Sequence, residues 1–278
     1  MSSFHFFKYE ASGNDFILVD ARHDDSLCQT CHALAQSLCD RHFGIGADGI
    51  LVITQTLNGD ADMDAAMHIF NADGSQADMC GNGIRCVARY LYKFYGFDPR
   101  KPLRIGTRGG LQTVKLLSKP FEDATTPWQL EVEMAHVSIT QDVHISQNGT
   151  EWHGQSLDVG NPHAVFEVDS PHLALQNAGQ FLSNHPTFPD RANIEFIHET
   201  TPGSIALCVF ERGVGPTLAC GTGCVAAAVS YASTHQRLGS VVQIHTPGGD
   251  LSVDVPASLE HVRLRGPARL LFEGKWRD

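Results

Sequence analysis

The pentapeptide Met79-Cys80-Gly81-Asn82-Gly83 has a counterpart in Ala219-Cys220-Gly221-Thr222-Gly223, one in each half of the chain. Both contain the pattern Cys-Gly-polar-Gly, and each opens a run of small and apolar residues, 84–91 in the first case and 224–231 in the second. A glycine-rich turn that leads into such a run predicts a helix that starts near Gly83 and another near Gly223. Because the motif recurs at matching places, it also indicates that the chain is built from two similar halves.

A cysteine at a helix start has favourable surroundings for acid–base chemistry. The first N–H groups of a helix have no partner within the helix, and the helix dipole adds partial positive charge at that end. Both effects favour the thiolate, and the glycines let an anionic carboxylate approach the backbone amides. If Cys80 and Cys220 face each other across such a carboxylate, one thiolate removes the α-proton while the other thiol protonates the opposite face. The amides then stabilise the enediolate that forms, and no cofactor is required.

The same two cysteines also have a purely structural interpretation. Free cysteine is among the most frequently buried residue types, so Cys80 and Cys220 could be small apolar side chains under tight turns. The repetition of the whole motif favours the catalytic interpretation.

The remainder of the chain is rich in short apolar runs bounded by Gly, Asn, Asp or Pro, which predict strands. We expect strands at residues 16–19, 50–53, 111–117, 164–168, 205–210, 241–245 and 251–255. A helix is predicted at 26–40, where Leu27, Cys31, Leu34 and Leu38 share one face. Many strands with few helices indicate an α+β protein, and the stretch 118–128, rich in Pro, Thr and acidic residues, is the best candidate for a linker.

Composition narrows the class of protein. The chain has 278 residues, 42% of them hydrophobic and 18% charged, which is typical of a packed globular protein. A net charge of −11 argues against a nucleic-acid partner, which would need a basic face. The start MSSFHFFKYE lacks the features of a secretory signal, and no apolar run is long enough for a membrane span. We therefore expect a cytoplasmic location, reduced cysteines and no membrane partner.

Two other classes of protein compete with the enzyme hypothesis. Cys28, Cys31 and Cys39, with His32 and His42 nearby, suggest a zinc-binding module, but a second Cys-x-x-Cys or a spaced His pair is missing. An apolar helix face explains this cluster better, so no metal is expected. A nucleotide-binding module is also disfavoured, because neither glycine-rich turn continues into a Gly-Lys-Ser/Thr or a complete dinucleotide fingerprint.

Six stretches, taken together and in order, resemble the diaminopimelate epimerase family, and the resemblance covers nearly the whole chain. These stretches are Gly13-Asn14-Asp15-Phe16, Gly44-Ile45-Gly46-Ala47-Asp48-Gly49, Asn71-Ala72-Asp73-Gly74-Ser75 with the Cys80 motif, Gly160-Asn161-Pro162-His163, Ala192-Asn193, and Glu211-Arg212-Gly213 with the Cys220 motif. The resemblance implies an isomerase that interconverts LL- and meso-2,6-diaminopimelate without pyridoxal phosphate, in the biosynthesis of lysine and peptidoglycan precursors. It further implies a homodimer of two-domain chains.

The fold that the resemblance implies has two similar α+β domains, each with strands wrapped around a central helix. The active site is expected in the cleft between the domains. The expected boundaries are 1–122 for the N-terminal half, joined by a returning strand at 267–278, and 123–266 for the C-terminal half.

The resemblance also assigns roles to individual residues. Cys80 and Cys220 are the expected catalytic bases, and His163 and Glu211 are expected to tune their protonation. The backbone of Gly81, Asn82, Gly221 and Thr222 would hold the reacting carboxylate. The distal amino-acid end of the substrate would bind Asn71, Asn161, Asn193 and Arg212, with Glu211 close by and Asn14 lining the site.

Several of these residues have plainer explanations. Asn71 could cap a turn, Asn161-Pro162 is common turn chemistry, Glu211-Arg212 could be a surface ion pair, and His163 could be a packed histidine. The chain also departs from the common family pattern at Ala11-Ser12 and at Gly49. Both departures affect substrate contacts rather than the cysteines.

The nearest rival within the same superfamily is a racemase of the proline or histidine type. Proline racemases usually have histidine where this chain has Asn82. A substrate with a single amino-acid end would also leave Arg212 buried and unpaired, which is costly. These two points favour diaminopimelate.

Overall fold

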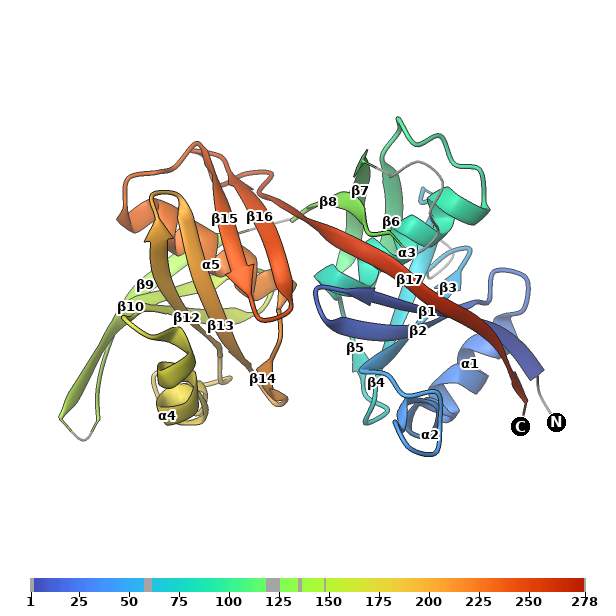
Figure 1. Cartoon of the computed structure of the whole chain (residues 1–278), viewed down its shortest axis with the longest axis horizontal. Coiled ribbons are helices and arrows are strands. Elements are labelled where there is room, and N and C mark those ends of the chain that lie inside the picture. Colours follow the sequence, from blue (N-terminus) through green and yellow to red (C-terminus); the bar gives the residue numbers. More distant parts are fainter. Residues whose placement is uncertain (1–2, 58–61, 119–125, 135–136, 148, 278) are drawn as a thin grey trace. The chain divides into compact units, whose positions relative to one another are not determined.

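The computed structural model describes residues 3–57, 62–118, 126–134, 137–147 and 149–277. The chain forms two compact units, one made of residues 1–132 with 266–278 and the other of 133–265 (Figure 1). The expected boundary between residues 122 and 123 lies outside the described residues, as does most of the expected linker.

Among the described residues of unit 1, nine strands and three helices carry the first half of the repeat. The strands are β1 (Ser3–Ala11), β2 (Asn14–Asp20), β3 (Gly49–Thr54), β4 (Ala65–Asn71), β5 (Gln76–Ala77), β6 (Leu103–Thr107), β7 (Gly110–Ser118), β8 (Trp128–Glu133) and most of β17 (Arg263–Arg277). The helices are α1 (Asp25–Ala33), α2 (Ala35–Cys39) and α3 (Gly81–Phe94).

Unit 2 repeats this plan. Its strands are β9 (Ser138–Gln147), β10 (Thr150–Asp158), β11 (Pro162–Glu167), β12 (Asn193–Thr201), β13 (Ser204–Glu211), β14 (Gly215–Thr217), β15 (Ser240–Thr246) and β16 (Gly249–Val255). Its helices are α4 (Pro171–Ser183) and α5 (Gly221–Thr234).

The strand pairings of the two units correspond one by one. β2 is parallel to β3 as β11 is to β12, and β4 is parallel to β6 as β13 is to β15. The antiparallel pairs β1–β2, β3–β4, β4–β5 and β6–β7 recur as β10–β11, β12–β13, β13–β14 and β15–β16. The register of the parallel pairs agrees as well. Phe16 and His163 each stand two residues after the asparagine of a Gly-Asn pair, and they pair with Gly49 and Asn193, the first residues of β3 and β12. The duplication indicated by the cysteine motifs is therefore present in the fold.

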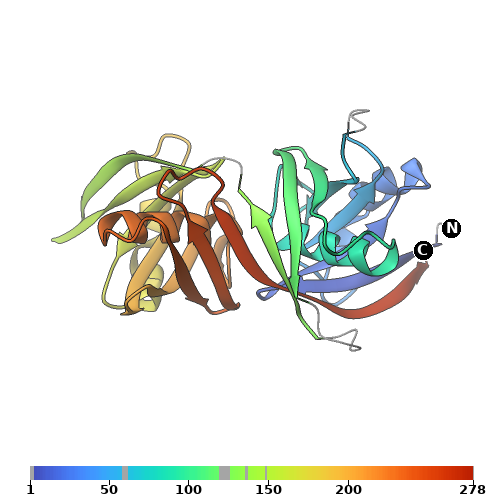
Figure 2. The ribbon, with the colours of Figure 1, turned by 90° about the horizontal axis from the view of Figure 1, so that it is seen from above.

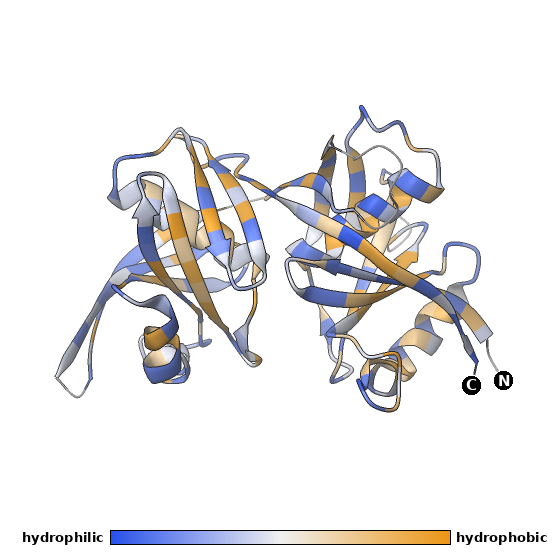
Figure 3. Cartoon of the chain, in the orientation of Figure 1, coloured by the Kyte–Doolittle hydropathy of each residue, from blue (hydrophilic) through white to orange (hydrophobic). Residues whose placement is uncertain are grey.

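Each unit wraps its strands around one central helix, α3 or α5, as Figure 2 shows from above. Most side chains of both helices are buried. The surrounding strands alternate in polarity, which is visible along β15 and β16 in Figure 3. This alternation lets one face of each strand contact the helix while the other faces outward. The expected α+β fold with a central helix in each half is confirmed.

All seven predicted strands coincide with observed ones, at β2, β3, β7, β11, β13, β15 and β16. The helix expected at 26–40 is two shorter helices, because the chain leaves the helical conformation at Leu34 (φ −96°, ψ 4°). Its apolar face is as expected, since Cys31 and Leu38 are buried in one core cluster and Leu27 and Leu34 pack against it. Helix α4 and several strands, β1 and β12 among them, were not predicted.

Two arginines on α3 are fully buried, which no pattern in the sequence predicts. Arg85 donates to the carbonyls of Gly81 and Pro267, and Arg89 donates to the carbonyl of Ala268. The guanidinium of Arg89 also lies 5.2 Å from the ring centre of Trp128. Buried guanidinium groups are tolerated where their N–H groups find acceptors, and here they bind β17 to the central helix. Within the described residues, no helix is long and apolar enough to cross a membrane.

Replacing Leu182 by alanine should test the core of unit 2. Leu182 is fully buried in the cluster between α4 and strands β11 and β12. Its truncation leaves a cavity and should lower the free energy of unfolding by about 2–5 kcal/mol. Leu173→Ala is the matched control on the same helix, because Leu173 is exposed. Urea denaturation followed by tryptophan fluorescence measures both, and equal effects would contradict the assigned packing.

Candidate active site

Each cysteine of the repeated motif is the N-cap residue of a central helix. Cys80 and Cys220 have extended backbones, and each sulfur accepts a hydrogen bond at 3.4 Å, from the N–H of Gly83 in unit 1 and of Gly223 in unit 2. The next N–H groups donate to the carbonyls of Cys80 and Cys220, at 3.0 and 2.9 Å. The amides of residues 81–82 and 221–222 therefore precede the first helical bond, at the end where helix amides point outward. Both predicted helix starts are confirmed. The helices begin at Gly81 and Gly221, two residues before the second glycine of each motif.

In unit 1, Cys80 lies beside two of the expected site residues. Its thiol donates to Oδ1 of Asn14 at 3.8 Å, and the Asn82 amide donates to the same oxygen at 3.4 Å. Asn14 is held in turn by Asp48, whose Oδ2 accepts from Asn14 Nδ2 at 2.8 Å. The Asn82 Oδ1 atom accepts a hydrogen bond from buried Arg85 at 2.9 Å, so the Asn82 side chain is held in place by a residue of unit 1.

Asn71, the last residue of β4, makes the turn contacts that its plainer interpretation predicts. Its Nδ2 donates to Oγ of Ser75 at 2.9 Å, and its backbone N–H donates to the Ser75 carbonyl at 2.8 Å. The side chain therefore closes the turn that leads to β5.

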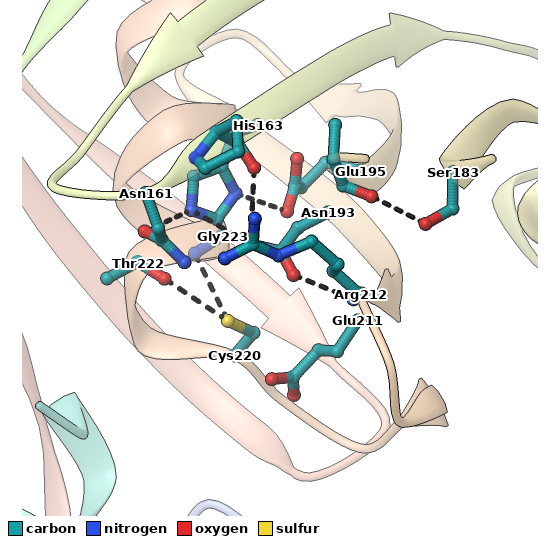
Figure 4. A network of polar contacts seen from close by, with 12 residues as sticks. Asn161, His163, Ser183, Asn193, Glu195, Glu211, Arg212, Cys220, Thr222 and Gly223 are labelled. Carbon is teal, nitrogen blue, oxygen red and sulfur yellow. Dashed lines mark hydrogen bonds and ion pairs between the residues drawn. The ribbon is translucent and has the colours of Figure 1, made fainter. Parts of the chain in front are cut away.

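In unit 2, the structure brings together most of the remaining expected residues around Cys220 (Figure 4). Thr222 Oγ1 lies 3.4 Å from the Cys220 sulfur. Asn193 Oδ1 accepts from the backbone N–H of Arg212 at 2.9 Å, and Asn193 Nδ2 lies 3.4 Å from His163 Nε2. Asn161 Oδ1 lies 3.0 Å from the same ring nitrogen. One histidine thus connects the two asparagines, and through Asn193 it connects to Arg212.

His163 is buried and is joined on its other side by Glu195. The His163 Nδ1 atom lies 2.8 Å from Glu195 Oε1, and neither side chain is exposed to solvent. Burial raises the pKa of Glu195, and the contact with His163 opposes that rise. The sequence did not single out Glu195. The sequence feature that could have identified Glu195 is a charged residue inside the otherwise apolar run 194–197.

The protonation of Cys220 differs from the expectation. Burial raises the pKa of the Cys220 thiol well above its ordinary value, and the negative charge of Glu211 raises it further. Hydrogen bonds from Thr222 and Gly223 act in the opposite direction but do not compensate. The expectation that the helix start makes this thiolate easier to form is therefore wrong for Cys220, because desolvation outweighs the helix amides. Such a cysteine holds its proton at neutral pH.

The expectation that an unused Arg212 would be buried and unpaired is also wrong. Arg212 is exposed, and its Nη1 donates to the carbonyl of Asp190 at 2.9 Å. The neighbouring Glu211 accepts a hydrogen bond from Thr217 Oγ1 at 2.5 Å. The guanidinium is therefore already available to a carboxylate from solvent.

The cysteines of the zinc hypothesis take part in packing. Cys31 and Cys39 are buried in the same core cluster of unit 1, and Cys28 packs against it. Burial raises the pKa of the Cys31 thiol to about 12, which disfavours the thiolate that zinc binds. Among the described residues there is no group of three or more His, Cys, Asp or Glu side chains placed to hold a metal ion.

Solved structures with the same fold define the class. A phenazine biosynthesis protein of the PhzF family from Bacillus anthracis matches with a TM-score of 0.74 and 13% identity, covering 100% of both chains. A hydroxyproline epimerase from Agrobacterium vitis matches with a TM-score of 0.73 and 15% identity, covering 99% of this chain and 91% of that one. At such identities the likeness shows the fold alone. The chain thus has the α+β fold of these structures, with one cysteine-capped helix in each of its own two units.

Sequence comparisons identify the family within that class. A family model described as Diaminopimelate epimerase matches residues 6–124 and 155–271. A diaminopimelate epimerase from Gloeothece citriformis is 39% identical over 280 residues, 97% of each protein. One from Pelotomaculum thermopropionicum is 36% identical over 282 residues, 98% of each protein. The chain belongs to the diaminopimelate epimerase family, and it is an isomerase.

Alanine at Gly223 should disturb the site more than alanine at Gly83. A Cβ at Gly223 would lie 2.7 Å from Glu195 Oε1, whereas at Gly83 it would lie 2.9 Å from Leu51 Cδ2. Glycine to alanine within a helix normally gains about 1 kcal/mol. Glu195 is fixed by His163 and cannot move aside, so Gly223→Ala should instead lose about 1–3 kcal/mol through overpacking.

Leu51 is held by apolar packing alone, so a small rotation of its side chain should make Gly83→Ala nearly neutral. Thermal denaturation of both variants provides the measurement. The same loss in both would argue against a fixed Glu195.

Proposed function

We propose that this enzyme interconverts LL- and meso-2,6-diaminopimelate, inverting one α-carbon through two cysteine acid–base groups. The observation that carries the proposal is the pair of cysteine-capped helix starts at equivalent places of two duplicated units. Membership of the family and the names of the relatives support the substrate. A single function for both cysteines explains why the motif, and not only the fold, is repeated.

In the proposed reaction, the α-carbon of the substrate lies between the two sulfurs. One thiolate takes the α-proton and becomes a thiol, and the electron pair moves into the carboxylate to give an enediolate. The other thiol then donates its proton to the opposite face of the carbon. The raised pKa of Cys220 suits the role of the group that still holds its proton when substrate arrives. Cys80 is then the group that takes the α-proton when the reaction starts from this state.

Backbone amides hold the reacting carboxylate in this proposal, at Gly81, Asn82, Gly221 and Thr222. Their position ahead of the first helical bond supports this role, because amides at helix starts bind anions and stabilise the enediolate as charge develops. No pyridoxal phosphate takes part, because the fixed amides stabilise the carbanion that the cofactor would otherwise stabilise.

The distal end of the substrate binds Asn161, Asn193 and Arg212, with Asn71 and Asn14 completing the site in unit 1. The exposed guanidinium of Arg212 is the group suited to the second carboxylate, because arginine binds carboxylates through two parallel hydrogen bonds. Asn193 fixes the backbone from which Arg212 extends. His163 and Glu211 set the protonation of the cysteines, and Glu211 is among the groups that raise the pKa of Cys220.

In the cell, this activity places the protein in the cytoplasm, in the synthesis of lysine and peptidoglycan precursors. We further propose that it is a homodimer, as the family resemblance implies. Size-exclusion chromatography with light scattering should give twice the mass of one chain, and a monomer at all concentrations would contradict this part of the proposal.

Single replacement of either catalytic cysteine should abolish epimerisation. In deuterium oxide, the reduced parent enzyme should incorporate deuterium at the α-carbon of diaminopimelate without added pyridoxal phosphate or metal. Cys80→Ser and Cys220→Ser should each lose interconversion, because a serine hydroxyl is too weak an acid to replace the thiol.

Cys208→Ser serves as the control for this pair, since Cys208 is a partly buried cysteine on β13 outside the site. It should retain the parent rate. Loss of activity in only one of the two catalytic variants would exclude the two-base mechanism, and lack of exchange by the parent would exclude the proposed function.

Removal of the Arg212 guanidinium should weaken substrate binding. Hydrogen bonds to charged groups contribute about 1.5–3 kcal/mol each, so Arg212→Met should raise KM at least about tenfold. Arg100→Met is the control, since Arg100 is an exposed arginine of unit 1 that pairs with Asp98. An unchanged KM in the Arg212 variant would remove this residue from the substrate site.

A further inference from the structure

The two halves of the repeat differ at one buried position beside the cysteine-capped helices. Leu51 of β3 and Glu195 of β12 are equivalent, since each lies two residues after the paired positions Gly49 and Asn193. Each also approaches the second glycine of its own motif: a Cβ added at Gly83 would meet Leu51, and one added at Gly223 would meet Glu195. The same structural place thus holds an apolar side chain in unit 1 and an ionisable one in unit 2.

The partner of this position differs in the same way. Phe16 pairs with Gly49, the first residue of the strand that carries Leu51. His163 pairs with Asn193, the first residue of the strand that carries Glu195, so His163 is the counterpart of Phe16. In unit 1 these positions hold two buried apolar side chains, and in unit 2 they hold a buried histidine and glutamate in contact at 2.8 Å. The backbone therefore does not require a polar pair here.

The Glu195 carboxylate is costly to keep in this position. It is fully buried, and among the described residues its Oε2 atom has no hydrogen-bond partner. An unsatisfied buried oxygen of this kind destabilises a protein, and an apolar residue of similar size is often the more stable choice. Unit 1 shows that leucine fits the equivalent place. The retention of a carboxylate thus calls for a chemical reason.

We propose that Glu195 is a positioning residue that keeps the proton on Cys220, and so makes the two catalytic cysteines unequal before substrate binds. Its carboxylate accepts the Nδ1 proton of His163, and its negative charge lies next to the first turn of α5, which Cys220 caps. A nearby negative charge disfavours the thiolate. The inference rests on the proposed function only in treating Cys220 as one of the two catalytic groups.

Several other ionisable groups surround α5, and they were weighed against Glu195. Glu211 at the end of β13 raises the Cys220 pKa in the same direction as Glu195 and by more, and it accepts a hydrogen bond from Thr217. Other ionisable side chains on the strands around α5 and at its end have partners of their own: His144 with His153, His235 with Glu167 and Glu199, His245 with Asp250, Asp254 with Arg263 and Arg265, and His198 with the carbonyl of Val168. Glu195 is distinguished from these groups by being a fully buried carboxyl beside the helix start.

The contact with His163 extends the effect of Glu195 toward the substrate. Glu195 holds the His163 ring at Nδ1, so that Nε2 faces Asn161 and Asn193, two of the side chains proposed to bind the distal end. A neutral ring carries its proton on one nitrogen only, so a carboxylate at Nδ1 leaves Nε2 to accept a hydrogen bond from Asn193 Nδ2. Glu195 therefore fixes both the charge near Cys220 and the orientation of this asparagine pair.

The thiol reactivity of Cys220 provides the direct test. Iodoacetamide labelling of the substrate-free protein over a range of pH, with each cysteine quantified by mass spectrometry, reports the thiolate fraction at each site. Glu195→Gln keeps the shape of the side chain and removes its charge. It should lower the Cys220 pKa and raise labelling at about pH 8 by roughly threefold to tenfold, since one pKa unit is a tenfold change in thiolate. Cys80 labelling should not change.

Two control variants and one internal reference separate charge from loosened packing. Glu195→Asp keeps the charge but shortens the side chain, so Cys220 should remain as unreactive as in the parent. Glu199→Gln removes a carboxylate of the same strand that also contacts a histidine, and it should have no effect. Cys224, fully buried one turn further along α5, reports any general opening. A parallel rise at Cys224, equal reactivity in the Asp and Gln variants, or unchanged Cys220 labelling in Glu195→Gln would each overturn the proposal.

The pH dependence of kcat/KM gives a second readout. In Glu195→Gln the basic limb, where Cys220 loses its proton, should move to lower pH, and the acidic limb should stay in place. A shift of both limbs, or of neither, would contradict the assigned role. Labelling does not require epimerase activity. An inactive parent with the expected labelling would therefore count against the proposed function and not against the role of Glu195.

Discussion

The need to satisfy the first-turn amides of two buried helices governs this structure. Helices α3 and α5 are enclosed by strands, so their N-terminal N–H groups cannot all rely on water. In both helices the sulfur of the capping cysteine accepts one of these groups, from Gly83 or Gly223. The amides before it remain directed out of the helix. Capping by an ionisable sulfur thus combines a structural requirement with a reactive group and an anion site.

The side chains around the cysteine-capped helix start differ between the two units. In unit 1 the sulfur lies beside the amide oxygen of Asn14, and an apolar leucine packs against the helix start. In unit 2 the equivalent space holds the His163–Glu195 pair, and the charge of Glu211 is near. Gene duplication explains the common backbone, and these substitutions explain how two identical motifs acquire different chemistry. An enzyme that removes a proton on one side and supplies one on the other benefits from such a difference.

Local patterns predicted much of this fold. The repeated motif, the two helix starts and seven strands could be found because glycine turns and alternating apolar residues act over a few neighbouring positions. Features set by distant contacts were missed. Arg85 and Arg89 look like ordinary helix residues until their acceptors, near residues 267–268, are known. The pKa of Cys220 was wrongly expected to fall, because the helix start is visible in the sequence and the burial around it is not.

The long strand β17 has a consequence for the order in which the chain can fold during synthesis. Residues 269–277 pair with β1 at the other end of the sequence, while unit 2 is continuous from 133 to 265. Unit 2 therefore contains all its strands as soon as those residues have left the ribosome. Unit 1 is made first, but until β17 arrives the edge of β1 stays open, and Arg85 and Arg89 lack the carbonyl acceptors of Pro267 and Ala268. The half that is translated first is thus the half that is completed last.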